Sequence, residues 1–147
     1  MRISLLIAVL GAGLAGCGGA PDIERPELIP TAGVVKQGEA PLADAEVRLI
    51  PIEKTPGQGA TGRTDAEGKF QLVAWTGEAG APAGKYRITV SRRLMPDGTP
   101  VPANDPTPPI ESPAVESLPP KYSSPEASEL TATIIPDGPP IEILLQP

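Results

Sequence analysis

The stretch TGRTDAEGKFQLV, residues 61–73, predicts two short β-strands joined by a tight turn. Phe70 and Leu72 alternate with Gln71 and Val73, which is the period-2 pattern of a half-buried strand. In the turn before them, the Asp65 carboxylate can accept hydrogen bonds from the backbone, and Gly68 can take a positive φ. The stretch therefore predicts an antiparallel strand pair.

The same alternation recurs in four further segments of the chain. The residues expected to face inward are Ala45, Val47, Leu49, Tyr86, Ile88, Val90, Leu130, Ala132, Ile134, Ile141, Ile143 and Leu145, and those expected to face outward include Glu46, Arg48, Arg87, Thr89, Thr131 and Thr133. Turn residues at 37–41 and 136–138 separate the strands. About seven short strands with Gly and Pro turns predict an all-β fold, an antiparallel sandwich.

Residues 94–121 interrupt this pattern. The segment carries nine of the 21 prolines in the chain, and proline donates no ladder hydrogen bond, so it cannot form a central strand. We interpret it as a long, partly polyproline-like excursion between two strands. Loops of this length are usually functional or disordered, and the sequence leaves both alternatives open. Its composition predicts that deletion of 94–121 leaves thermal stability nearly unchanged.

The N-terminus has the pattern of a secretory signal peptide over residues 1–16. Arg2 is followed by an uncharged run, 3–13, which is too short to cross a membrane. The sequence Leu14-Ala15-Gly16-Cys17 resembles the lipobox of bacterial lipoproteins. That resemblance implies cleavage before Cys17, a diacylglycerol on its sulfur, and membrane lipid as a partner. Residues 17–30 would then be a lipidated tether.

Charge and composition exclude several classes of function. The formal net charge is −6, and it becomes −7 when Arg2 leaves with the signal peptide. An acidic protein without a basic run is a poor partner for nucleic acid. The chain has no His, and Cys17 is its only Cys, so the usual general base and transition-metal ligands are missing. We expect no catalytic residues, no metal and no cofactor. A Ser-Lys pair or a pair of carboxylates can catalyse reactions without His, but the sequence has no recognisable motif for either.

Four motifs in a fixed order resemble a known domain family. They are Gly33-Val34-Val35, residues 41–47, residues 61–70 and residues 84–90. In this order they are similar to the carboxypeptidase regulatory-like, or transthyretin-like, β-sandwich domain. Residues 118–122 and 128–131 look like the tail of small planctomycete-type bacterial lipoproteins. The resemblance implies a seven-stranded immunoglobulin-like or transthyretin-like sandwich over 31–147, in a family where this domain is an accessory module without catalysis.

Candidate ligand contacts are few. Trp75 precedes a flexible loop and can either stack on a sugar ring or cover one end of the core, which the sequence favours. Lys121 and Tyr122 follow the excursion and, with residues 92–93, can form a small basic-aromatic spot; the alternative is solubilising charge at strand ends. Two carboxylates, at 65 and 67, are too few for calcium, and turn capping accounts for the first.

These observations predict a non-catalytic, lipid-anchored protein of the cell envelope that faces the periplasm or the exterior. Its role would be binding, display or structural support, with an envelope protein or a glycan as the partner. Strand edges and the 94–121 excursion are the expected contact surfaces. The alternative is a carbohydrate-binding module that uses Trp75 and adjacent loops.

Overall fold

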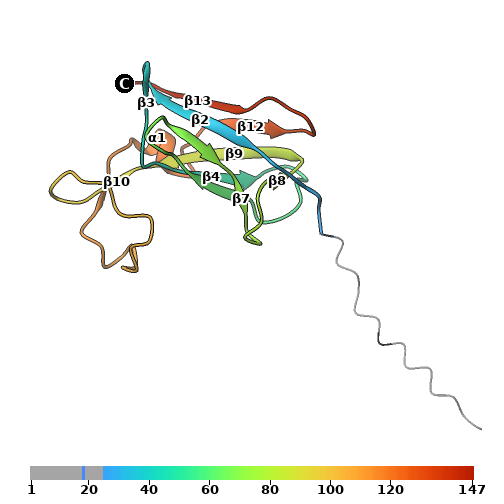
Figure 1. Cartoon of the computed structure of the whole chain (residues 1–147), viewed down its shortest axis with the longest axis horizontal. Helices are drawn as coiled ribbons and strands as arrows, with labels where there is room; N and C mark the ends of the chain where they lie inside the picture. Colours follow the sequence, from blue (N-terminus) through green and yellow to red (C-terminus); the bar gives the residue numbers. More distant parts are fainter. Residues whose placement is uncertain (1–17, 19–24) are drawn as a thin grey trace, which may run out of the picture.

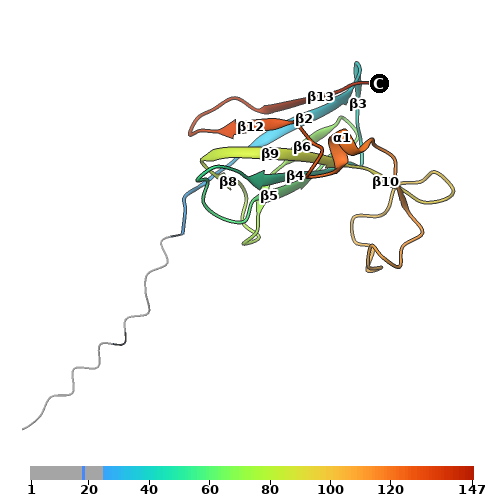
Figure 2. The same ribbon diagram turned by 180° about the vertical axis from the view of Figure 1, so that it is seen from behind.

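The computed structural model describes residue 18 and residues 25–147, and this part of the chain is all-β apart from one short helix. Two main sheets lie one over the other in Figure 1, with β13 and β2 above β9 and β4, and Figure 2 shows the same layers from behind. In chain order the elements are β1 (Leu28–Ile29), β2 (Ala32–Gln37), β3 (Ala40–Pro41), β4 (Glu46–Pro51), β5 (Ala60–Arg63), β6 (Lys69–Gln71), β7 (Val73–Ala74), β8 (Ala81–Pro82), β9 (Gly84–Ser91), β10 (Arg93–Leu94), β11 (Val115–Glu116), α1 (Pro120–Ser123), β12 (Thr131–Ile134) and β13 (Ile141–Leu145).

The larger sheet has five strands in the order β12-β9-β4-β5-β7, and every pair in it is antiparallel. In the smaller sheet β2 is central: β13 lies on one side of it, and β3 and β6 pair with it on the other. Two short antiparallel pairs, β1 with β8 and β10 with β11, lie outside these sheets.

One hydrophobic core takes side chains from both main sheets. Val47 and Ile88 contribute from the larger sheet, and Val35, Phe70 and Ile143 contribute from the smaller one. Each is at most 3% exposed. Full burial of such a side chain stabilises the fold by about 1.5–3 kcal/mol. The predicted period-2 pattern is confirmed in β4, β9 and β13, whose apolar residues alternate toward this core.

The turn between β5 and β6 has the predicted chemistry. The Asp65 Oδ1 accepts hydrogen bonds from the backbone N–H groups of Glu67 and Lys69, both at 2.9 Å. Gly68 has a φ of 73°. A Cβ at this position would lie 2.4 Å from the carbonyl oxygen of Val35, so the glycine is required both for its conformation and for the close approach of β2.

The expectation of a purely antiparallel fold is wrong at one pair. β13 runs parallel to β2, with Ile141 opposite Gly33 and Leu145 opposite Gln37. These strands are joined through most of the chain, so no local turn fixes their relative direction. A period-2 pattern gives the buried face of each strand but not the direction of its partner.

Two boundaries predicted from the sequence also differ from those in the structure. Leu28 and Ile29 form β1 on β8, and Ile29 packs on the core, so the described domain begins inside the predicted tether of 17–30. At the other boundary, β10 and β11 close the excursion as a pair, and Leu118 is 6% exposed within the core. The loop proper is therefore 95–114. Removal of all of 94–121 would remove core side chains, which contradicts the expected small effect on stability.

Candidate functional site

The outer face of the larger sheet carries a polar groove of about 450 Å³. Its floor comes from β4 and β9, and its wall comes from the excursion, which projects beyond the end of the two sheets in Figure 1. Thr89, expected to face outward into solvent, lies in this floor and is only 6% exposed. Sequence reasoning missed this groove because the residues of its wall, Val101 and Ser112 among them, are distant from Thr89 in sequence.

Two arginines hold the excursion in place. The Arg63 guanidinium on β5 donates to the carbonyl oxygen of Val101 at 2.6 Å. That of Arg93 donates to the carbonyl oxygens of Ala114 at 2.7 Å and Pro109 at 3.2 Å. Arg93 therefore binds the excursion through its backbone carbonyl groups. Both arginines also line the groove, so the structure of the loop and the shape of the groove depend on the same side chains.

The closing end of the excursion is fixed by one carboxylate. Glu116 on β11 accepts a hydrogen bond from the Ser91 hydroxyl, and its Oε1 accepts from the backbone N–H groups of Arg92 at 2.9 Å and Leu118 at 3.0 Å. Bonds to an ionised group are stronger than neutral ones. The Nε of Arg92 is buried without a hydrogen-bond partner in the described part of the chain.

Turns within the excursion are stabilised by carboxylates. Hydrogen bonds from the hydroxyl and backbone N–H of Thr99 lower the pKa of Asp97. Hydrogen bonds from Thr107, whose backbone N–H lies 2.8 Å away, lower the pKa of Asp105. Asp105 also lines the groove, so a charged group forms part of its wall at neutral pH.

Trp75 lies directly after β7 at the edge of a second hollow of about 310 Å³. Its indole packs on Gly57, where a Cβ would lie 2.4 Å from the ring, and the residue remains 38% exposed. Gln58, Thr61 and Arg48 line the same hollow. Trp75 is not part of the buried core cluster, so an aromatic surface remains accessible beside hydrogen-bonding groups.

Lys121 and Tyr122 lie on α1, which packs against β9, and neither lines a hollow with Trp75. Tyr122 is 7% exposed and belongs to the core cluster. Its hydroxyl accepts the backbone N–H of Gln146 at 3.0 Å, a bond that is the main cause of its lowered pKa. The Lys121 ammonium lies 4.8 Å from the Tyr122 ring centroid and donates to the Gln146 side chain. These contacts hold the C-terminal strand, so the ring of Tyr122 offers no platform for a ligand.

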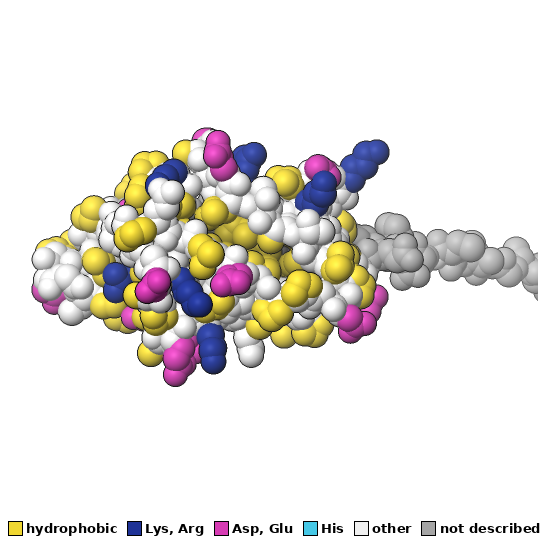
Figure 3. Space-filling model, turned by 90° about the horizontal axis from the view of Figure 1, so that it is seen from above, with side chains coloured by type: hydrophobic (Ala, Val, Ile, Leu, Met, Phe, Trp, Pro, Cys, Tyr) yellow, Lys and Arg dark blue, Asp and Glu magenta, His cyan; other side chains and the backbone are white. Residues whose placement is uncertain are grey.

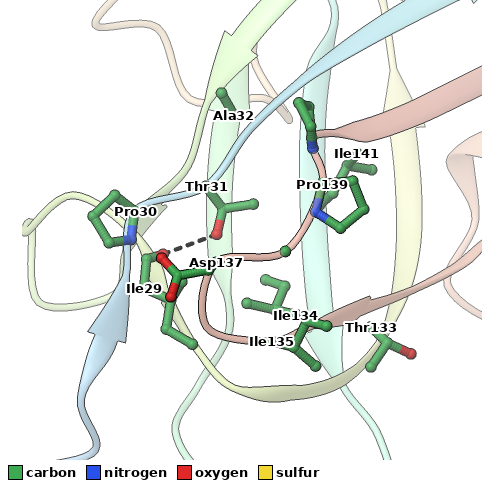
Figure 4. A pocket seen from close by; sticks show the side chains of 12 residues that line it. Ile29, Pro30, Thr31, Ala32, Thr133, Ile134, Ile135, Asp137, Pro139 and Ile141 are labelled. Atoms are coloured by element: carbon green, nitrogen blue, oxygen red, sulfur yellow. Dashed lines mark hydrogen bonds between the residues drawn. The ribbon is translucent and has the colours of Figure 1, made fainter.

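A third hollow, of about 390 Å³, lies where the described chain enters the fold. Figure 4 shows its mostly apolar lining, which comes from the start of β2 and from the loop between β12 and β13. The Thr31 hydroxyl already donates to the carbonyl oxygen of Ile29 at 2.8 Å. Asp137 contributes the one carboxylate of the lining. No nucleophile and base meet among these residues.

The face seen from above in Figure 3 mixes charges of both signs with hydrophobic side chains. Among the described residues, no group of three or more carboxylate, thiol or imidazole side chains is close enough together to hold a metal ion. Nor does this part of the chain contain a helix long and apolar enough to cross a membrane. Cys17 and the predicted signal peptide, 1–16, lie outside the described residues.

No family model matches this chain, and no curated protein or solved structure is significantly similar to it.

Proposed function

We propose that the protein is a lipid-anchored, non-catalytic binding module of the bacterial cell envelope, held to the membrane through an acylated Cys17. The domain would be an immunoglobulin-like or transthyretin-like sandwich of the carboxypeptidase regulatory-like type. The back-bond from the Tyr86 hydroxyl to Pro82, four residues earlier, supports this fold type, because immunoglobulin-like sandwiches use a similar tyrosine corner.

The observation that carries the proposal is that the chain enters the domain at one end and the excursion lies at the other. The described chain enters beside β1 and β8, and the excursion projects from the opposite end (Figures 1 and 2). A domain tethered by its N-terminus would therefore present the excursion away from the membrane, toward an envelope partner. Residues 95–114 and the exposed strand edges are the contact surfaces in this proposal.

The anchor can be tested in the full chain with Cys17→Ser. In a bacterial host supplied with a clickable fatty acid, the wild-type protein should take up the label and sediment with membranes. The variant should lose both properties, because the thiol is the acceptor of the lipid. An unlabelled wild-type protein, or a variant that still sediments with membranes, would contradict the anchor. Cross-linking in intact cells then identifies a protein partner.

A carbohydrate-binding role is the second candidate, favoured by the exposed indole of Trp75 beside hydrogen-bonding side chains. Trp75→Ala should abolish retention on immobilised glycans and leave the fold intact. Leu144→Ala is the control, because Leu144 is an apolar residue on β13, in the smaller sheet, is 60% exposed and lines none of these hollows. Unfolding of the Trp75 variant would instead assign the indole to the packing of the domain.

A further inference from the structure

The two hollows on the outer face of the larger sheet are parts of one surface. Arg48 lines both the groove beneath the excursion and the hollow beside Trp75. Trp75 lies at one end of this surface, and the excursion walls the other. A ligand on Arg48 therefore has an aromatic ring on one side and a polar groove on the other.

The strand register places four residues of this surface in one row. Val73 pairs with Thr61, Thr61 pairs with Arg48, and Arg48 pairs with Thr89, so four residues form a row across β7, β5, β4 and β9. With neighbouring strands about 4.8 Å apart, the row is about 14 Å long. We call Trp75 and these four residues the outer track. Under the outer track the backbone of β5 and β4 pairs with a strand on each side, so the side chains are the groups presented to what lies on it.

Thr89 supplies an independent indication of a ligand. Its hydroxyl makes no hydrogen bond to another group in the described part of the chain, although the residue is only 6% exposed. The oxygen is not among the atoms sealed from solvent, so it opens into the groove that Thr89 lines. A hydroxyl that opens into the groove without a protein partner is available to hydrogen-bond a ligand there.

The charges around the groove balance. Two ion pairs lie in it, Arg48 with Glu46 at 2.9 Å and Arg63 with Asp44 at 3.4 Å. Three acidic and three basic side chains line it in all, namely Asp44, Glu46, Asp105, Arg48, Arg63 and Arg93. Such a surface gives no electrostatic preference for a polyanion or a polycation. It suits a ligand that is polar and uncharged.

We propose that the outer track binds an extended neutral polysaccharide, an inference that rests on the carbohydrate candidate above. One sugar stacks its C–H face on Trp75, whose ring face carries partial negative charge. The next sugars lie over Thr61 and Arg48, which supply hydroxyl and guanidinium groups, and a further sugar hydroxyl bonds to Thr89. A peptide is a poorer fit, because peptides that recognise sheets use free backbone groups at an edge.

Affinity electrophoresis of the full chain in detergent tests this proposal, with gels that contain a soluble neutral glucan, a neutral mannan or the anionic polysaccharide alginate. The wild-type protein should be retarded by at least one neutral polymer and not by alginate. Thr89→Val keeps the shape of the side chain and removes its hydroxyl, and it should weaken binding by about three- to tenfold. Thr133→Val, on the exposed face of β12 away from the outer track, is the matched control and should bind like the wild type.

Each other outcome overturns the proposal in a distinct way. Loss of binding in Trp75→Ala but not in Thr89→Val would show that the sugar stacks on Trp75 alone and does not extend along the outer track to Thr89. Retardation by alginate alone would assign the surface to an anionic ligand. No retardation by either neutral polymer would overturn the proposal, and cross-links from the outer track to a protein would then assign the surface to a protein partner. The lipid anchor is tested separately at Cys17, so its failure would not be confused with any of these results.

Discussion

The hydroxyl of Tyr86 donates a hydrogen bond to the carbonyl oxygen of Pro82, four residues earlier, at 2.7 Å. Tyr86 is 0% exposed, and Pro82 is also fully buried, so water cannot replace this bond. We expect Tyr86→Phe, which retains the ring, to lower the free energy of unfolding by about 1–2 kcal/mol. Urea denaturation measures the change. An unchanged midpoint would contradict the importance of this bond for the join between β8 and β9.

The two tyrosines of the chain should ionise in a fixed order. Burial raises the pKa of Tyr86, whereas the N–H of Gln146, followed by Lys121, lowers the pKa of Tyr122. Ultraviolet absorption of the phenolate should therefore show two steps, with Tyr122 first. In Tyr122→Phe the first step should disappear, and in Tyr86→Phe the second. A first step that persists in Tyr122→Phe would contradict this order.

The same shifts determine how stability changes in alkali. Because the folded pKa of Tyr86 lies above its unfolded value of about 10, its contribution is complete below that pH and is lost as the pH rises through the folded pKa. For Tyr122 the folded pKa is the lower one, so its contribution is present above the unfolded value and is lost as the pH falls through the folded pKa.

Alanine substitutions at Gly68 and Gly77 distinguish the cost of a strained backbone from the cost of a steric clash. Both have positive φ, 73° and 87°. A Cβ at Gly77 would meet nothing within 4 Å, whereas one at Gly68 would meet the carbonyl oxygen of Val35 at 2.4 Å. Gly77→Ala should therefore cost about 1 kcal/mol, from φ alone. Gly68→Ala should cost about 2 kcal/mol more, because β2 must move. Equal losses in thermal unfolding would contradict the assigned role of Gly68.

The features that the sequence predicts correctly are those that depend on residues close together in the chain. The inward-facing residues of β4 and β13 follow from alternation alone, and the Asp65 turn follows from its side chain and a nearby glycine. Both are local, because a strand has two faces and a tight turn has few conformations.

The features that the sequence does not predict depend on contacts between residues far apart in the chain. Arg63 and Val101 are 38 residues apart, and their contact brings the excursion over the larger sheet. That contact changes Thr89 from an expected surface residue into the floor of a groove. The parallel direction of β13 beside β2 has the same origin, since only the complete fold determines which distant strands meet. The candidate site could not be assembled from the sequence for this reason, although Trp75 was a candidate from the start.

The excursion itself should be dispensable for folding, provided that its closing end is kept. No residue of 95–113 is buried, whereas Ala114 and Leu118 are each 6% exposed. Because Leu94 pairs with Val115, a short glycine-containing turn can join β10 to β11 in place of residues 95–113. We expect this replacement to change the free energy of unfolding by less than about 1 kcal/mol, because loop length affects stability only weakly.

Leu118→Ala is the matched comparison for that replacement. It removes a single side chain at the closing end, but that side chain belongs to the core cluster, so it should cost about 2–5 kcal/mol. Urea denaturation of both variants compares a change of nineteen residues outside the core with a change of one residue inside it. If the replacement proves the more destabilising of the two, then the hydrogen bonds from Arg63 and Arg93 to the excursion stabilise the larger sheet itself. The excursion would in that case be part of the folding unit rather than a wall added to the outer track.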